Sequence, residues 1–282
     1  PGPTGLSYLA NLRSLEELNI STGVPLADND LAAMESLTGL KKLVIFCPSV
    51  SDKGMASIGK LRQLENLTLM TKVTRNGLNQ LNGLSRLRQL QASGHYETSA
   101  VAQLDETPLD LSGLKSLVDL QLGGLSLNDE DLAFLTRLSS LERLMIQPTS
   151  PLMGKSLRHL GDLPELNCLL LYNVSNCSGE DLTCLGRLPK LRLLRADGDI
   201  TDTALASLTG LASLGSLEVS TNAPIRRETV TNLAAKLPQL ESVHIRELPP
   251  WMTRPAEAGK DTGIESAPVN RRPATTGRRG RR

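Results

Sequence analysis

The histidines and cysteines are the side chains of this sequence best able to supply acid–base, nucleophilic or metal-binding chemistry. His95, His159 and His244 lie far apart in the sequence, and none stands beside a serine or cysteine in a nucleophile motif. The four cysteines are Cys47, Cys168, Cys177 and Cys184. Their spacing fits no zinc site, and no histidine accompanies them at ligand spacing. The sequence therefore predicts free thiols, no catalytic residue, no metal site and no cofactor.

Gly154-Lys155-Ser156 has the same residues as the end of a phosphate-binding loop. The complete motif needs a further glycine five residues earlier, where this chain has Thr149. Prolines at 148 and 151 also interrupt the segment. We interpret these residues as the start of a short helix rather than as a nucleotide site.

Along most of the chain, leucine residues recur at a spacing that no single helix could bury on one face. From Leu205 to Leu217 a leucine recurs at every third residue, and Val219 follows two residues later. Each step of three residues falls about 60° short of a full helical turn, so one helical face cannot contain the whole run. The pattern predicts a short helix, a bend and then a strand with alternating side chains.

The same pattern occurs ten times, at intervals of 23 to 30 residues. The first core residues of the predicted strands are Leu18, Leu43, Leu67, Leu90, Leu120, Leu144, Leu169, Leu194, Leu217 and Val243. A second apolar residue or alanine follows each after two positions, and leucines precede most of them at −3 and −6, as at Leu15 and Leu12. Only 2% of the residues are aromatic, so leucine supplies most of the core. A repeat of this length predicts a solenoid in which successive units stack.

The pattern resembles the leucine-rich repeat signature, L-x-x-L-x-L-x-x-N/C-x-L, over about residues 6–248. Ile200-Thr201-Asp202 matches a fuller consensus that begins φ-[ST]-D, and Val50-Ser51-Asp52 and Leu127-Asn128-Asp129 are close copies. This form is similar to repeats of bacterial leucine-rich repeat proteins and to those attached to F-box domains. The resemblance implies an α/β solenoid: a right-handed horseshoe of about ten repeats, with a parallel sheet on the concave side and short helices on the convex side.

The polar residues before each helical segment are suited to capping a helix. The expected N-caps are Ser51, Asn128, Ser178 and Thr201. Asn128 with Asp131, and Ser178 with Asp181, resemble capping boxes in which Asp replaces Glu or Gln. After the strands, only Asn222 matches the asparagine that often forms an amide ladder in this family. We therefore expect irregular loops after the strands.

The candidate binding residues occupy the strand positions that face away from the core. Side chains alternate along a strand, so positions −1, +1 and +3 relative to the first core residue line the concave side. On the sixth to eighth predicted strands these positions include Arg143, Met145, Cys168, Leu170, Tyr172, Leu193 and Arg195. A smaller group contains Val44, Phe46 and Met70. Apolar residues with an aromatic ring and an arginine rim are typical of partner-binding surfaces, although single exposed apolar residues are also common.

The longest repeat carries an insert of about five residues between Gly94 and Asp110. It includes His95, Tyr96 and Glu97. Inserts in solenoids often extend a binding face, and the alternative is a tolerated loop. The sequence leaves both interpretations open.

The charges divide the chain into two predicted domains. Residues 254–282 carry eight basic and three acidic side chains, whereas the whole chain has a net charge of +1. We expect a repeat domain at 1–253 and a disordered Pro/Gly/Arg-rich tail at 254–282. The tail is a weak candidate for contact with nucleic acid or another anionic surface.

The absence of an initiator methionine at Pro1 indicates a fragment or a processed product. No apolar run has the length of a membrane span.

These features favour a protein as the binding partner. We expect a non-catalytic scaffold that recognises this partner through its concave sheet. Two alternatives remain: the substrate-recognition arm of a larger enzyme assembly, such as a ubiquitin ligase or a bacterial effector, and a structural, envelope-associated repeat segment.

Overall fold

The computed structural model describes residues 5–21, 26–94 and 107–248. The chain divides into two units, Pro1–Leu248 and Pro249–Arg282. The predicted basic tail, the last five residues of the predicted repeat domain, and His95, Tyr96 and Glu97 of the insert lie outside the described residues. The fold below is therefore that of the first unit.

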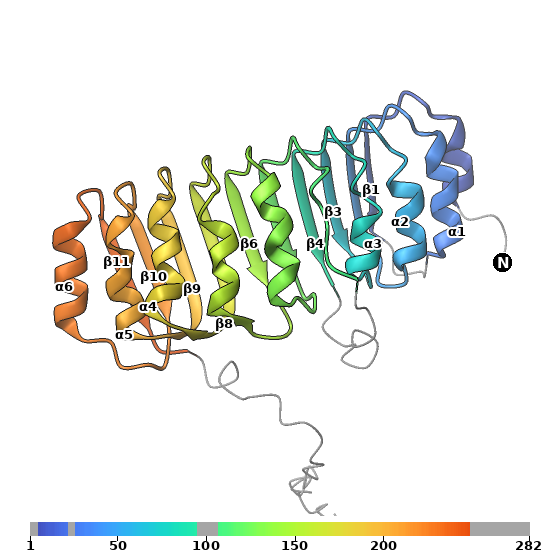
Figure 1. The fold of residues 1–282 in the computed structure, drawn as a ribbon. Coiled ribbons are helices and arrows are strands. Elements are labelled where there is room, and N and C mark those ends of the chain that lie inside the picture. The colour runs from blue at the N-terminus through green and yellow to red at the C-terminus, as the bar shows by residue number, and fades with distance from the viewer. Residues whose placement is uncertain (1–4, 22–25, 95–106, 249–282) are drawn as a thin grey trace, which may run out of the picture. The chain divides into compact units, whose positions relative to one another are not determined.

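Parallel strands of successive repeats form one continuous sheet (Figure 1). They are β1 Glu17–Ser21, β2 Lys42–Phe46, β3 Asn66–Met70, β4 Gln89–Ser93, β5 Asp119–Gly123, β6 Arg143–Gln147, β7 Leu152–Met153, β8 Cys168–Cys177, β9 Leu193–Ile200, β10 Ser216–Ser220 and β11 Ser242–Arg246. Each strand pairs with the next, except that the short β7 lies off this path and pairs only with β8. The ten predicted strands are confirmed, and their predicted core residues stand in register, as Leu120, Leu144 and Leu169 do.

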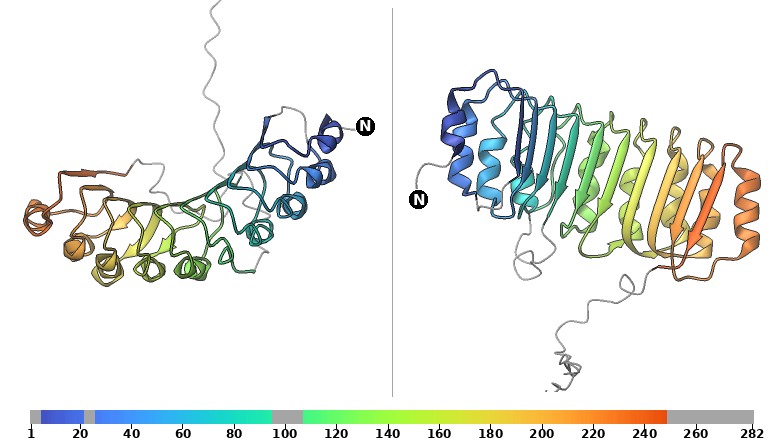
Figure 2. Two further views of the ribbon diagram at one scale, coloured as in Figure 1. Left: turned by 90° about the horizontal axis from the view of Figure 1, so that it is seen from above. Right: turned by 180° about the vertical axis from the view of Figure 1, so that it is seen from behind.

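Short helices cover the convex side of the sheet, and the strands line the concave side (Figure 2). The α-helices are α1 Asp28–Leu31, α2 Asp52–Ile58, α3 Arg75–Asn79, α4 Gly179–Thr183, α5 Asp202–Ala206 and α6 Arg227–Lys236. The described 3₁₀ segments include η1 Gly5–Asn11, η2 Ala32–Ser36, η4 Asp129–Arg137, η5 Gly154–Leu160, η6 Cys184–Arg187 and η7 Ser207–Gly210. The leucine spacing of three favours these 3₁₀ turns, because a 3₁₀-helix has three residues per turn. The predicted α/β solenoid horseshoe is confirmed.

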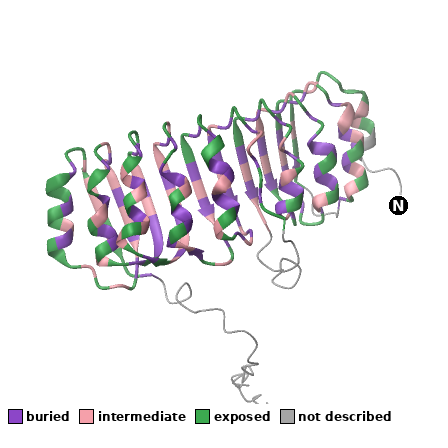
Figure 3. Ribbon diagram, in the orientation of Figure 1, coloured by how far each residue is buried: buried purple, intermediate pink, exposed green. Residues whose placement is uncertain are grey.

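Buried residues recur along the strands and helical segments (Figure 3), and leucine is the most frequent of them, with Ile, Val, Met, Cys, Ala and Phe at the other core positions. Leu120, Leu144 and Leu169 are buried side by side, and the intervening strand residues face the concave side. The first repeat departs from the pattern, since Leu12 is 47% exposed although its spacing predicts a core position. No described residue stacks against this repeat from the N-terminal side, so its leucines are less covered than those of central repeats.

The aspartate of the φ-[ST]-D consensus joins each helix start to the next repeat. Asp52 accepts hydrogen bonds from the backbone N–H of Thr74 at 2.8 Å and from its hydroxyl at 2.5 Å. Asp202 likewise accepts from the N–H of Arg226 at 2.9 Å and from its Nε at 2.8 Å. These bonds satisfy backbone donors that a helix start leaves unpaired. The aspartate therefore stabilises stacking as well as its own helix.

The predicted N-caps also lie at helix starts. The side chains of Ser51, Asn128 and Thr201 accept backbone N–H bonds from their own first turns. Asp131 accepts the N–H of Asn128 at 2.7 Å, which completes the predicted capping box. At Ser178 both the N–H and the hydroxyl donate to Asp181. These contacts confirm the predicted helix starts.

A buried ion pair spans the repeat that lies between β4 and β5. The described part of this repeat, residues 107–118, contains no helix. Arg75 Nη1 lies 2.7 Å from Asp131 Oδ2, and the Asp131 side chain is fully buried. Asp131 also accepts the N–H of Leu109 at 2.8 Å. The Arg75 side chain thus joins the start of α3 to the start of η4, past the described residues of the intervening repeat.

The turns after the strands are more regular than the sequence predicts. Leu248 N–H donates to Asn222 Oδ1 at 3.2 Å, as expected for the only matching asparagine. After other strands, the backbone hydrogen bonds between neighbouring repeats continue into the turn, for example from Gly124 N–H to the carbonyl of Gln147 at 2.9 Å. The expectation of loops is wrong for β8 and β9, which continue through the turn to Cys177 and Ile200, but their pairing there is irregular, with register shifts between Leu171 and Val174 and between Val174 and Cys177.

Glycine makes this continuation possible. Gly198 in β9 has a φ of +149° and pairs with Val174 of β8. A Cβ at this position would overlap the carbonyl oxygen of Val174, so only glycine allows the two strands to approach this closely. Asn173 and Asn176, with φ of 58° and 49°, provide the bends in β8.

Candidate partner-binding surface

Three neighbouring strands bring the larger predicted group of binding residues together. We name it the central patch: Arg143, Met145, Cys168, Leu170, Tyr172, Leu193 and Arg195. Met145 of β6 pairs in register with Leu170 of β8, and Cys168 of β8 pairs with Leu193 of β9. These four side chains are all half-buried, whereas the core leucines on the opposite face are fully covered. The register therefore confirms that the predicted residues are neighbours on one face.

Both arginines of the central patch form ion pairs within the sheet. Arg143 donates from Nε and Nη2 to Oδ2 of Asp119 on the neighbouring β5, at 3.0 and 2.7 Å. Arg195 donates to Asp197, two residues along β9, at 3.0 Å. The sequence analysis placed the arginines at the rim but did not identify these carboxylate partners. Arg143 and Asp119 occupy the same position of neighbouring strands, and Arg195 and Asp197 lie two residues apart on one strand, so the repeat alignment shows that each pair is within reach but not that it forms.

Tyr172 is held in place by its surroundings. The guanidinium carbon of Arg195 lies 5.1 Å from the centre of its ring, which is cation–π distance. Burial raises the pKa of the Tyr172 hydroxyl, so this group remains a neutral donor and acceptor at physiological pH. An aromatic ring fixed by a paired arginine loses little conformational freedom when it is covered.

The smaller predicted group forms a second exposed surface, which we name the N-terminal patch: Val44, Phe46 and Met70. Phe46 of β2 pairs in register with Met70 of β3. Their exposed fractions are 37% and 40%, larger than those of the apolar residues in the central patch. The strand register shows which side chains are neighbours, but it does not show how far each one is exposed.

The remaining chemistry-bearing residues are dispersed. His159 lies on η5 and His244 on β11, on different sides of the sheet. Lys155 pairs with Asp129 at 2.9 Å, and the buried Ser156 hydroxyl donates to the carbonyl of Met153. Within the described ranges, no group of three or more His, Cys, Asp or Glu is placed to hold a metal ion. The Gly154-Lys155-Ser156 segment is therefore the start of a repeat helix, as the sequence indicated.

All four cysteines are free thiols. Cys168 faces the concave side, as its strand position predicts, and Cys184 begins η6. Cys177 ends β8, because that strand continues through the turn. Burial raises the pKa of the Cys177 thiol to about 12.

Alkylation of the folded protein should separate these thiols. We expect iodoacetamide to label Cys177 on the order of tenfold more slowly than Cys168, because Cys177 is buried and strongly disfavours the reactive thiolate. Peptide mass spectrometry of a time course gives the two rates, and labelling in guanidinium is the control. Equal rates in the folded state would contradict the placement of Cys177.

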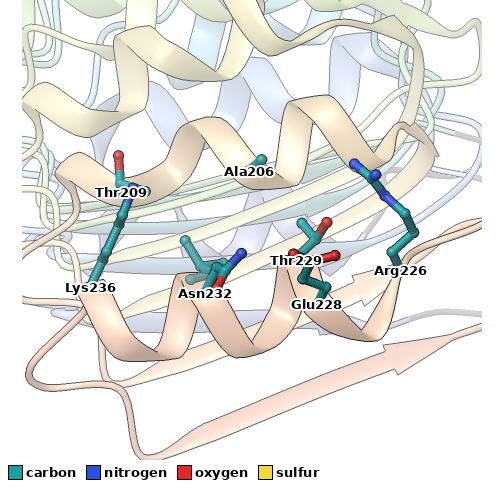
Figure 4. A pocket seen from close by; sticks show the side chains of 8 residues that line it. Ala206, Thr209, Arg226, Glu228, Thr229, Asn232 and Lys236 are labelled. Carbon is teal, nitrogen blue, oxygen red and sulfur yellow. The ribbon is translucent and has the colours of Figure 1, made fainter.

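A depression of about 240 Å³ lies on the helix side, between the helical segments of the last two repeats (Figure 4). It is lined by Ala206, Thr209, Arg226, Glu228, Thr229, Asn232, Leu233 and Lys236. Arg226 and Lys236 stand at opposite ends of α6 (Figure 4), and Arg226 is paired with Asp202 at 2.7 Å. This depression is a gap between neighbouring repeat helices and brings together none of the predicted binding residues.

Comparison with solved structures supports this architecture. The chain is similar to an internalin from Listeria monocytogenes, with a TM-score of 0.57 and 21% identity over 86% of this chain and 73% of that one. The chain has the leucine-rich repeat fold. No protein-family model matches it, and no curated protein matches it.

Two other solved structures are less similar. A leucine-rich repeat protein of Leptospira interrogans has a TM-score of 0.46 and 18% identity, over 84% of this chain and 68% of that one. A plant peptide hormone receptor in complex with RGF2 has a TM-score of 0.49 and 18% identity, over 86% of this chain and 45% of that one. In the part of this leucine-rich repeat chain that the structure describes, no helix is long and apolar enough to cross a membrane.

Proposed function

We propose that this chain is a non-catalytic leucine-rich repeat scaffold that recognises a protein partner through the concave face of its sheet. The central patch carries the proposal. Met145, Leu170 and Leu193 contribute little to the core, because the core positions of the same strands are already filled by Leu144, Leu169 and Leu194. Covering these half-exposed side chains with a partner would remove further apolar surface from water.

The patch has the composition of an interaction hot spot. Tyrosine and arginine are enriched at the residues that dominate binding energy, and Tyr172 and Arg195 are in contact here. Both lie on strands of a continuous sheet rather than on loops, so their positions are fixed before a partner arrives. Such preorganisation lowers the entropic cost of association.

A paired substitution tests this function. We expect Leu170→Ser with Tyr172→Ser to weaken partner binding more than tenfold, because the change removes the centre of the patch while leaving the core intact. The measurement is affinity capture from an extract of the native source, with bound proteins quantified by mass spectrometry.

A matched control uses the same residue types away from the sheet. Tyr8 and Leu12 are 75% and 47% exposed in the first repeat, so Tyr8→Ser with Leu12→Ser removes more exposed apolar surface than the test variant does, but outside the patch. Proteins captured by the wild type should persist with this control. Capture at unchanged yield by the folded Leu170→Ser, Tyr172→Ser variant would exclude the central patch as the binding surface.

The same experiment separates the alternatives. A substrate-recognition arm of a larger enzyme assembly would recover enzyme components together with a patch-dependent protein. A structural, envelope-associated segment would show no capture that depends on the central patch. The bacterial or F-box-associated subtype of the repeats rests on the φ-[ST]-D consensus alone and stays a prediction, as does any contact of the basic tail with an anionic surface.

A further inference from the structure

A continuous stretch of the concave face carries no charged residue. It consists of the +1 and +3 positions of six neighbouring strands from β2 to β8, and we name it the neutral lane. Its members are Val44, Phe46, Thr68, Met70, Gln91, Ser93, Gln121, Gly123, Met145, Gln147, Leu170 and Tyr172. Protein surfaces carry charges at about a quarter to a third of their positions, so twelve uncharged positions in one block are a departure from an ordinary solvated face.

The lane has apolar ends and an amide-rich centre. Phe46 and Met70 occupy the β2–β3 end, and Leu170 and Tyr172 occupy the β8 end. Between them, β4 to β6 present Met145 and the side chains of Gln91, Ser93, Gln121 and Gln147, of which Gln121 donates to Asp119 at 3.2 Å and keeps its carbonyl oxygen as an acceptor. A glutamine amide both donates and accepts hydrogen bonds, and so does a peptide backbone. The centre is therefore suited to a chain whose own backbone groups are unpaired, as in an extended segment.

The charges beside the lane are already neutralised. Lys42 pairs with Glu17 at 3.4 Å, and Arg143 pairs with Asp119 at 2.7 Å. Beyond β8, Arg195 pairs with Asp197 at 3.0 Å. A charged ligand side chain placed in the lane would lose water without gaining an opposite charge, which is unfavourable. These pairs disfavour the acidic ligand group that an arginine rim alone would suggest.

The distance between the apolar ends sets the spacing of the ligand's anchors. Met70 and Tyr172 occupy the same column, four strand steps apart along the sheet. At about 4.8 Å per step they are roughly 19 Å apart. An extended chain advances about 3.3 Å per residue, so about six residues bridge this distance.

We propose that the neutral lane binds an extended, uncharged segment of the protein partner that carries two apolar anchors about six residues apart. One anchor contacts Phe46 and Met70, and the other contacts Leu170 and Tyr172. The intervening peptide backbone hydrogen-bonds with the glutamines of β4 to β6. This inference rests on the proposed function and specifies the form of the partner.

Selection from a library of displayed random peptides, about 16 residues long, tests the inference on the whole chain. We expect the enriched peptides to share two apolar positions separated by five to seven residues, with few charges between them. Their dissociation constants, measured by fluorescence anisotropy, should change less than about twofold between low and high salt, because no ion pair forms. Replacing either anchor of the peptide by serine should weaken binding more than tenfold.

Substitutions in the protein test where on the neutral lane the two peptide anchors bind. The double variant Phe46→Ser with Met70→Ser should weaken peptide binding more than tenfold. In this variant, replacing the peptide anchor that contacts Phe46 and Met70 by serine should cause no further loss of affinity, which is the result that a double-mutant cycle gives for residues in contact. Gln91→Glu adds a carboxylate to the centre without touching the core and should weaken binding at least fivefold. Tyr8→Ser with Leu12→Ser is the control and should leave the affinity unchanged.

The outcomes distinguish this inference from the proposed function. Enrichment of acidic or basic peptides, or binding that ignores Phe46, Met70 and Gln91, would overturn the two-anchor ligand. The two-anchor ligand would also be overturned if the library yielded no binder while capture of extract proteins still depended on Leu170 and Tyr172. That result would leave the proposed function in place. Loss of both kinds of patch-dependent binding would overturn the two together.

Discussion

Asp131→Ala should lower the free energy of unfolding by about 3–5 kcal/mol, the usual cost of removing one partner of a buried ion pair. The Asp131 side chain is fully buried and accepts hydrogen bonds from Arg75 and from the N–H groups of Leu109 and Asn128. Its removal leaves the buried guanidinium of Arg75 without an opposite charge and orphans two backbone donors. Denaturant titration followed by circular dichroism measures the change.

Asp181→Ala is the matched control for this prediction. Asp181 occupies the same capping position, where it accepts from the N–H and the hydroxyl of Ser178, and its side chain is half-exposed. The control should therefore lose about 1 kcal/mol, the typical value of a helix cap. Similar losses for the two variants would show that the ion pair with Arg75 adds nothing to stability beyond capping.

The strands and the core follow directly from the sequence because of a simple geometric constraint. Buried side chains in a strand recur every two residues, and stacked repeats place equivalent positions side by side. Leu144 and Leu169 therefore identify their strands, their register and the face that they bury. The same alternation places Met145 and Leu170 on the opposite face, so the central patch could also be predicted.

Interactions between polar side chains are less predictable. The contact between Arg75 and Asp131 joins residues 56 positions apart, across a repeat whose irregular length interrupts the spacing. The partners of Arg143 and Arg195 depend on side-chain rotamers, which a strand register does not determine. The ion pairs of Arg143 and Arg195 lie on the proposed binding face, whereas the Arg75–Asp131 pair lies in the helical layer and belongs to the fold.

Leu144→Ala should lower the free energy of unfolding by about 2–5 kcal/mol, through lost burial and the cavity that remains. Leu144 of β6 is almost fully buried and stands between Leu120 and Leu169, which are also buried. Repeats stack on both sides of it, so the surrounding structure has little freedom to close the cavity. In a solenoid, one core residue also supports the interfaces with both neighbouring repeats.

Two comparison variants show whether this loss comes from burial in a central repeat. Gln121→Ala, on the concave face of the neighbouring strand, should change stability by no more than about 0.5 kcal/mol. Leu18→Ala removes the equivalent leucine of the first repeat, where it is only half-buried, and should cost less than Leu144→Ala. The order of the three losses in denaturant titrations is the decisive measurement. A loss at Gln121 as large as that at Leu144 would mean that the concave and core faces of the sheet are reversed, because only a buried side chain leaves a cavity behind.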